Sequence, residues 1–133
     1  MTRSITYYSL LLCLFLSINS VYGQQTEEIF TRVEKMPEFP GGQVALVKYI
    51  HKNLKYPTAA KKAKLEGKVL ITFVVDKTGR VADAKVTKSL SPECDAEALR
   101  VVQHMPAWAP GEKDGKPVSI HFTLPIQFEL TRE

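Results

Sequence analysis

The sequence predicts an α+β domain of two layers, in which a three-stranded antiparallel sheet has helices on one face. Residues 118–130 alternate apolar and polar side chains without a break, which is the period of a half-buried strand. Residues 68–76 are rich in β-branched side chains, and the turn sequence DKTG leads into a second strand-like stretch at 80–89. Two other segments carry apolar residues at helical spacing and a third is a run of good helix formers, so helices and strands share one short chain.

The first helix is expected over 43–54, where four apolar residues recur at helical spacing: Val44, Val47, Ile50 and Leu54. The next segment, TAAKKAKLEG, predicts a short second helix with Thr58 as its cap and Gly67 as its terminator. The third helix is expected to begin at Asp95, since acidic residues near a helix N-terminus are favourable, and Pro106 ends it.

The last predicted strand contains a proline, Pro125. A proline cannot donate to the hydrogen-bond ladder of a sheet, so it belongs on an edge strand or at a bulge. We therefore expect an open β-edge at the C-terminal strand, available to an incoming strand. The side chains predicted to border a bound peptide are Ser119, His121, Thr123, Pro125 and Gln127.

Residues 1–23 have the layout of a secretory signal peptide: Arg3, an apolar run, then small or polar residues up to Gly23. The alternative is a retained membrane anchor, although serine and asparagine residues interrupt the run. Residues 24–41 are polar, end in prolines and glycine, and predict a short tether to a domain at 42–133. The protein is therefore expected in the periplasm, or anchored at the inner membrane if the segment is retained.

Composition and motifs argue against catalysis and against nucleic-acid binding. The net charge of +4 is too weak to indicate a nucleic-acid partner, and aromatic residues are not interleaved with the lysines. The three histidines lack metal-ligand spacing, and no nucleophile or phosphate-binding motif occurs. Cys94, the one cysteine after residue 23, is interpreted as a small buried apolar residue. We expect no enzyme activity, cofactor or metal.

The only tryptophan lies in a proline frame, Pro106-Ala107-Trp108-Ala109-Pro110, followed by Gly111. Both prolines restrict the backbone, which holds the indole at one place between the last helix and the last strand. Two interpretations stay open. Trp108 is either a structural plug in the core or an aromatic shelf for a ligand.

The succession YPTAAKKAKLEGKVLITFVVDKTGRV, DAEALRVVQHMPAWAPG and GKPVSIHFTLPIQF resembles the TonB C-terminal domain family, in particular its short-linker members from Bacteroidetes-type bacteria. The likeness covers about residues 42–130. The motif positions that match are Tyr56, Pro57, Gly67, Val69, Gly79, Asp95, Glu97, Ala98, Met105, Pro106, Trp108, Pro110 and Gly111.

The resemblance implies a periplasmic energy-transducer domain that supports transmembrane transport. Such a domain grips the TonB box of outer-membrane receptors by strand addition to its C-terminal strand, here 117–130. A full transducer also has an inner-membrane helix that contacts proton-driven motor proteins, and a long proline-rich spacer. This chain departs from that pattern, since its tether spans at most about 65 Å when extended. The alternative function is a secreted interaction domain that binds other peptides or forms a homodimer, with no role in energy transduction.

Overall fold

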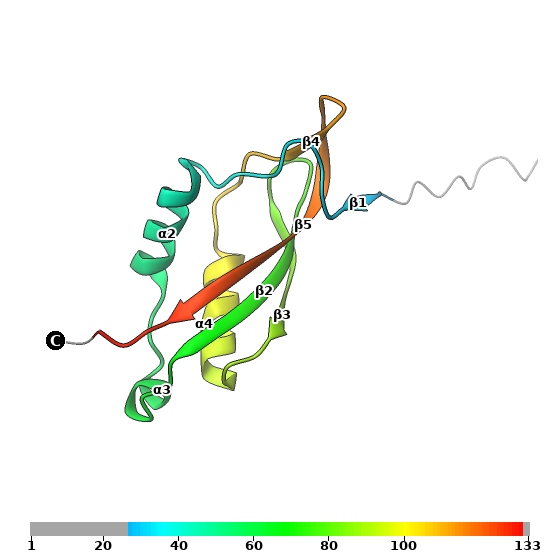
Figure 1. Ribbon diagram of the computed structural model, residues 1–133. Helices are drawn as coiled ribbons and strands as arrows, with labels where there is room; N and C mark the ends of the chain where they lie inside the picture. Colours follow the sequence, from blue (N-terminus) through cyan, green and yellow to red (C-terminus); the bar gives the residue numbers. More distant parts are fainter. Residues whose placement is uncertain (1–26, 132–133) are drawn as a thin grey trace, which may run out of the picture.

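The computed structural model describes residues 27–131, and the predicted signal segment 1–23 lies outside them. Helices and strands are mixed along the chain in the order β1-α2-α3-β2-β3-α4-β4-β5 (Figure 1). Their bounds are β1 Ile29–Phe30, α2 Gly42–Asn53, α3 Thr58–Lys62, β2 Gly67–Val75, β3 Val81–Lys88, α4 Pro92–Gln103, β4 Gly111–Lys113 and β5 Lys116–Phe128. The three long strands are those that the sequence predicts.

The sheet has the order β1-β5-β2-β3, with β4 paired to the beginning of β5. Strands β2 and β5 are antiparallel from Gly67 opposite Phe128 to Val75 opposite Ile120. The predicted α+β class with helices on one face is confirmed. Two short strands add to the three expected ones. The Asp114-Gly115 turn, with φ of 53° and 75°, folds β4 back onto β5.

Strand β1 is the only parallel strand among residues 27–131, and it comes from the segment expected to be a tether. Two further bridges attach this segment to the domain, Lys35 to Glu112 and Glu38 to Ala109. Phe39 is buried in the core. The described part of the segment therefore lies on the domain over most of its length.

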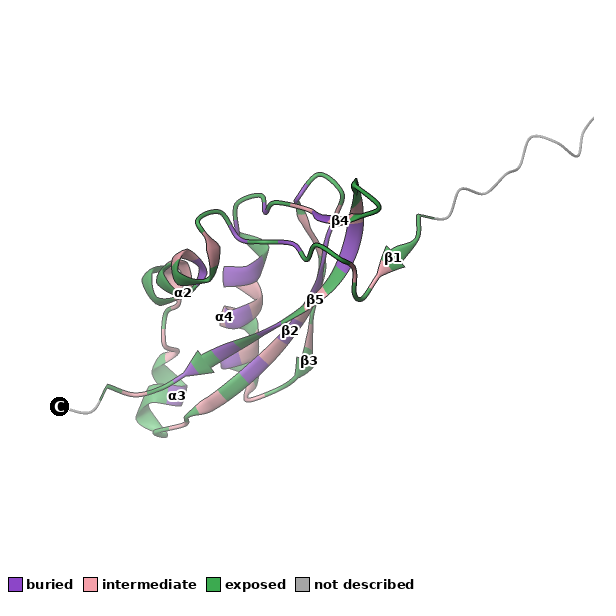
Figure 2. Ribbon diagram, turned by 45° about the horizontal axis from the view of Figure 1, so that its top comes forward, coloured by how far each residue is buried: buried purple, intermediate pink, exposed green. Residues whose placement is uncertain are grey.

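The core lies between the sheet and the helices (Figure 2). One face of β2 and β5 supplies seven of the fifteen buried residues of the core cluster: Val69, Ile71, Phe73, Val75, Leu124, Ile126 and Phe128. Helix α4 covers this face with Cys94, Ala98 and Val102, and the Cys94 thiol is free and buried as expected. Alternate residues of each strand point to the opposite face, as the period of two requires.

Three predicted helix boundaries are wrong: the start of α4 and both ends of α3. Helix α4 begins at Pro92 because Ser91 is its cap, whose hydroxyl accepts from the Cys94 amide at 3.1 Å, and Asp95 lies within the first turn. Helix α3 has Pro57 rather than Thr58 at its cap position and ends at Lys62. The chain turns at Lys64, whose φ is +52°, so Gly67 begins β2 rather than ending a helix.

Helix α2 forms where the apolar spacing predicts it, but it buries a different side. Its only buried residue is Leu46, and Tyr49 and Ile50 pack beside the core. Val44 and Val47 are 68% and 46% exposed. The repeating apolar residues therefore mark a side of α2 that the core leaves partly open.

Candidate functional site

From residue 121 to 128, strand β5 is paired on one side and open on the other. Strand β2 pairs with it along residues 120–128. On the opposite side, β1 pairs only with Ser119 and Ile120. Within residues 27–131, no strand pairs with that side of 121–128. This stretch is the open edge, and its backbone N–H and C=O groups can serve a further strand.

Four of the five predicted peptide-binding residues lie along the open edge: His121, Thr123, Pro125 and Gln127. All four side chains are exposed, and they alternate with core residues. The fifth, Ser119, is buried and its hydroxyl donates to Glu27 Oε1 at 2.7 Å. The structure therefore places Ser119 under the N-terminal segment, at the part of β5 that β1 already covers.

Pro125 lies within the β2–β5 pairing, opposite Leu70, and the register continues on both sides of it. A proline has no N–H to donate, so its nitrogen fits a position that faces the open edge. The sequence argument for an edge strand therefore agrees with the observed topology.

The other edge of the sheet, along β3, is irregular. The β2–β3 register shifts twice, and Asp83 in the second shift has a φ of +50°. Lys85 and Lys88 are exposed on the same strand. Bulges and lysines are devices that prevent an edge from pairing with another chain. The β5 edge, whose pairing with β2 shows no shift, is the one suited to strand addition.

Trp108 belongs to the core cluster and is only 4% exposed. Its ring contacts Phe39, Phe73 and Phe122 at centroid distances of 5.7, 5.6 and 5.2 Å, all near edge-to-face. Its backbone N–H donates to the Gly79 carbonyl at 2.7 Å. These contacts join the β2–β3 turn, the N-terminal segment and β5, which supports the plug interpretation.

The remaining motif residues fix the helices against the sheet. The Tyr56 ring packs edge-on against Phe128 at 5.6 Å, and its hydroxyl donates to the Leu65 carbonyl. Asp95 accepts from the Leu90 backbone and the Ser89 hydroxyl, which holds the β3–α4 connection.

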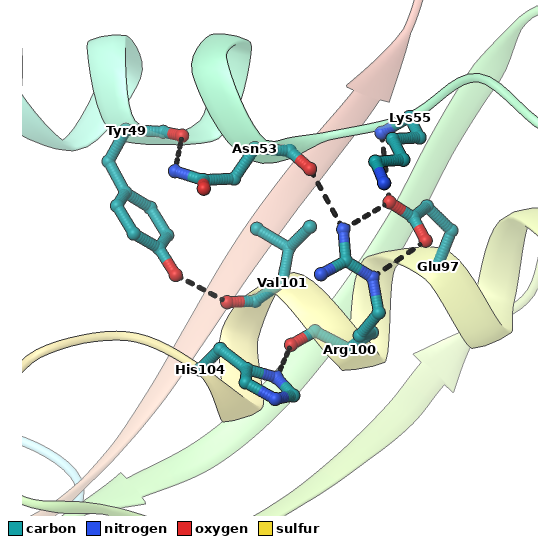
Figure 3. Close-up of polar contacts among 7 residues, drawn as sticks. All are labelled: Tyr49, Asn53, Lys55, Glu97, Arg100, Val101 and His104. Atoms are coloured by element: carbon teal, nitrogen blue, oxygen red, sulfur yellow. Dashed lines mark hydrogen bonds and ion pairs between the residues drawn. The ribbon is translucent and has the colours of Figure 1, made fainter.

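Glu97 and Arg100 of α4 hold the end of α2 (Figure 3). The Glu97 carboxylate accepts from Arg100 at 2.6 and 3.0 Å and from the Lys55 backbone N–H at 2.8 Å. Arg100 also donates to the carbonyl of Asn53, the last residue of α2, at 2.8 Å. The Tyr49 hydroxyl donates to the Val101 carbonyl at 3.1 Å. Helix α2 is thereby fixed beside the open edge.

The Glu97 contacts predict a pH dependence of stability. Hydrogen bonds from Arg100 lower the pKa of the Glu97 carboxyl, with a smaller effect from the Lys55 N–H, while burial opposes them. A lowered folded-state pKa gives stability that is present above the unfolded value of about 4.3 and is lost as the pH falls through the folded value. We expect Glu97→Gln to cost about 1 kcal/mol at pH 7 and less at pH 3.

Denaturant unfolding at both pH values measures this difference. Glu93→Gln is the matched control, since Glu93 is an exposed residue of the same helix. An equal cost of Glu97→Gln at pH 7 and pH 3 would rule out the charge-dependent role.

Sequence reasoning missed a groove next to the open edge. It has a volume of about 310 Å³ and is bordered by the outer side of α2 and the end of β5. Its lining residues are Val47, Ile50, His51, Leu54, Tyr56, Pro125, Gln127, Phe128 and Glu129. The sequence does contain a signal for this groove: α2 repeats more apolar residues than the core buries.

Within residues 27–131, no three His, Cys, Asp or Glu side chains gather as metal ligands would. In the same part of the chain, no helix has the length and apolar character needed to cross a bilayer.

The fold and the open edge define a two-layer α+β domain that presents one regular strand edge beside a helix. Residues 52–130 match the family described as Gram-negative bacterial TonB protein C-terminal. This match covers more than half of the chain, which therefore belongs to that family.

The fold is also similar to solved structures of one relative. Two NMR solution structures of the Helicobacter pylori TonB C-terminal domain, of a shorter and a longer fragment, match with TM-scores of 0.51 and 0.50. Each is 24% identical and covers 68% of this chain, and the match spans 95% and 81% of the respective fragments. The comparison with curated proteins gives no significant match.

Proposed function

We propose that this protein is a TonB-like component of the cell envelope that binds the TonB box of outer-membrane transporters by strand addition to the open edge. The observation that carries the proposal is the contrast between the two sheet edges. Residues 121–128 of β5 form a regular edge without a partner strand in the described part of the chain, while β3 is bulged. Family membership supports the same role.

The open edge suits an extended peptide for a physical reason. Backbone hydrogen bonds along a strand edge give affinity with any sequence, and the side chains at alternate positions add selectivity. Strand β1 runs parallel to β5 on this side, directly before the open residues. A ligand strand in the same parallel direction would continue its ladder. Pro125 leaves one position of that ladder without a donor.

Such a role is non-enzymatic, and it places the domain in the periplasm with residues 1–23 as an export signal. If that segment is instead retained as an anchor, inner-membrane motor proteins become partners as well. A homodimer through the same edge is the competing use of residues 121–128.

Peptide binding is expected to shift the amide NMR signals of residues 121–128 and to leave those of β3 unchanged. The measurement is a titration of isotope-labelled protein, produced with its own N-terminal segment, with synthetic TonB-box peptides. Peptides N-methylated at alternate positions provide a matched control, because only every second N–H of an added strand faces β5. One of the two alternating sets should abolish binding and the other should leave it intact.

Equal loss with both N-methylated sets, or shifts confined to β3, would contradict strand addition at β5. NMR spectra of the protein without peptide, recorded at several concentrations, test the homodimer: signals of residues 121–128 that are broadened and sharpen on dilution would favour self-association over peptide binding.

A further inference from the structure

The outer side of α2 carries apolar side chains that the domain itself leaves uncovered. Val47 is nearly half exposed although Ile50, one helical turn further along, and Leu54, two turns further along, pack against the core. Exposed apolar groups grouped on one side of a helix indicate a contact surface rather than chance exposure. Figure 2 shows the mixture of exposed and partly buried residues along this helix.

These side chains form one wall of the groove, and the end of β5 forms the other. Val47, Ile50 and Leu54 come from the helix side. Pro125, Gln127 and Phe128 come from the end of β5, where the open edge lies. The groove is therefore continuous with the open edge, and a strand added to residues 121–128 would run along its opening.

Hydrogen bonds fix the position of the wall that α2 forms. The Arg100 guanidinium donates a hydrogen bond to the carbonyl of Asn53, the last residue of α2. Glu97 accepts one from the backbone N–H of Lys55, just beyond the helix (Figure 3). The ring of Tyr56 packs on Phe128, and both residues line the groove. A groove whose walls are held in place can select among side chains, since no reorganisation of the domain is needed to fill it.

The pleat of the sheet decides which ligand residues reach the groove. In a strand added to β5, alternate side chains lie on the same face as Leu124, Ile126 and Phe128, which is the face that the helices cover. The residues between them lie beside His121, Thr123 and Gln127, which face solvent. The first set therefore lies on the face of the sheet that carries α2.

We propose that the α2–β5 groove binds an apolar side chain of the strand that adds to the open edge, and so sets the sequence preference of this domain. The partner is an extended segment of an outer-membrane protein that carries an aliphatic or aromatic residue at a helix-facing position, paired near the end of β5. This inference rests on the proposed function, because the strand must bind β5 before its side chain can enter the groove.

The test compares two valines of the same helix. Val47 lines the groove and Val44 does not, and both are exposed, so an aspartate at either position leaves the core intact. We expect Val47→Asp to weaken binding of a TonB-box peptide by roughly 10- to 100-fold, the range for losing one buried aliphatic contact. Val44→Asp should change affinity by less than about 3-fold.

The ligand side gives an independent readout. Each apolar residue of the peptide is replaced in turn by serine, and affinity is measured by calorimetry with the wild type and with Val47→Ser, the milder variant. One replacement, at a helix-facing position, should weaken binding to the wild type and have little further effect on Val47→Ser. Non-additivity of this kind reports direct contact between the two side chains.

The outcomes separate the two proposals. If the peptide binds the open edge but Val47→Asp and Val44→Asp behave alike, the groove proposal is overturned while strand addition stands. If serine replacements add independently to Val47→Ser, the groove proposal fails in the same way. If no peptide shifts the signals of 121–128, both proposals fail.

Discussion

Replacing Trp108 by alanine is expected to lower the free energy of unfolding by about 3–5 kcal/mol. The indole is almost fully buried and contacts three aromatic rings from three parts of the chain. Alanine would leave a cavity between the N-terminal segment and the sheet, which the surrounding rings can fill only partly. A loss of this size is a large part of the 5–15 kcal/mol that typically stabilises a domain.

Trp108→Phe is the matched control. Among the described residues, the indole Nε1 of Trp108 is buried without a hydrogen-bond partner. Phenylalanine removes this N–H while it keeps an aromatic ring, so its cost should be clearly below that of alanine. Urea unfolding of the three proteins measures the order. A stable Trp108→Ala variant that had lost only peptide binding would favour the ligand-shelf interpretation instead.

Gly79→Ala is expected to destabilise the domain by about 3 kcal/mol or more. The φ of Gly79 is +88°, a region that costs other residues about 1–2 kcal/mol. A Cβ there would also lie 1.9 Å from the Trp108 carbonyl oxygen, which is too close for any non-bonded contact. The backbone would have to shift, and with it the hydrogen bond from the Trp108 N–H to the Gly79 carbonyl.

Gly115→Ala separates these two effects. Gly115 has a similar φ of +75°, but a Cβ at this position meets nothing within 4 Å. Its replacement should therefore cost only the backbone term, about 1–2 kcal/mol. Thermal unfolding of both variants gives the comparison. Equal losses of stability at the two glycines would mean that the close approach of Gly79 to the Trp108 carbonyl does not contribute to the cost of Gly79→Ala.

The two glycines differ in how much of their role the sequence could reveal. The DKTG turn predicts positive φ at Gly79 by local chemistry alone. Its contact with Trp108 joins residues 29 positions apart, and nothing local indicates it. The same holds for Glu97. The sequence places this acidic residue near a helix start, where a negative charge is favourable, but its partners are Arg100 on the same helix and the Lys55 backbone beyond α2.

The amino-acid sequence by itself determined the three long strands, the three helices and the edge character of β5. These follow from the period of two, from helical spacing and from Pro125, which are properties of short segments. Tertiary structure alone decided that β1 covers Ser119 and Ile120, that β3 is the bulged edge, and that α2 turns Val47 toward a groove. Those features depend on which distant segments pack together, because burial of shared apolar surface, rather than local propensity, selects the partners.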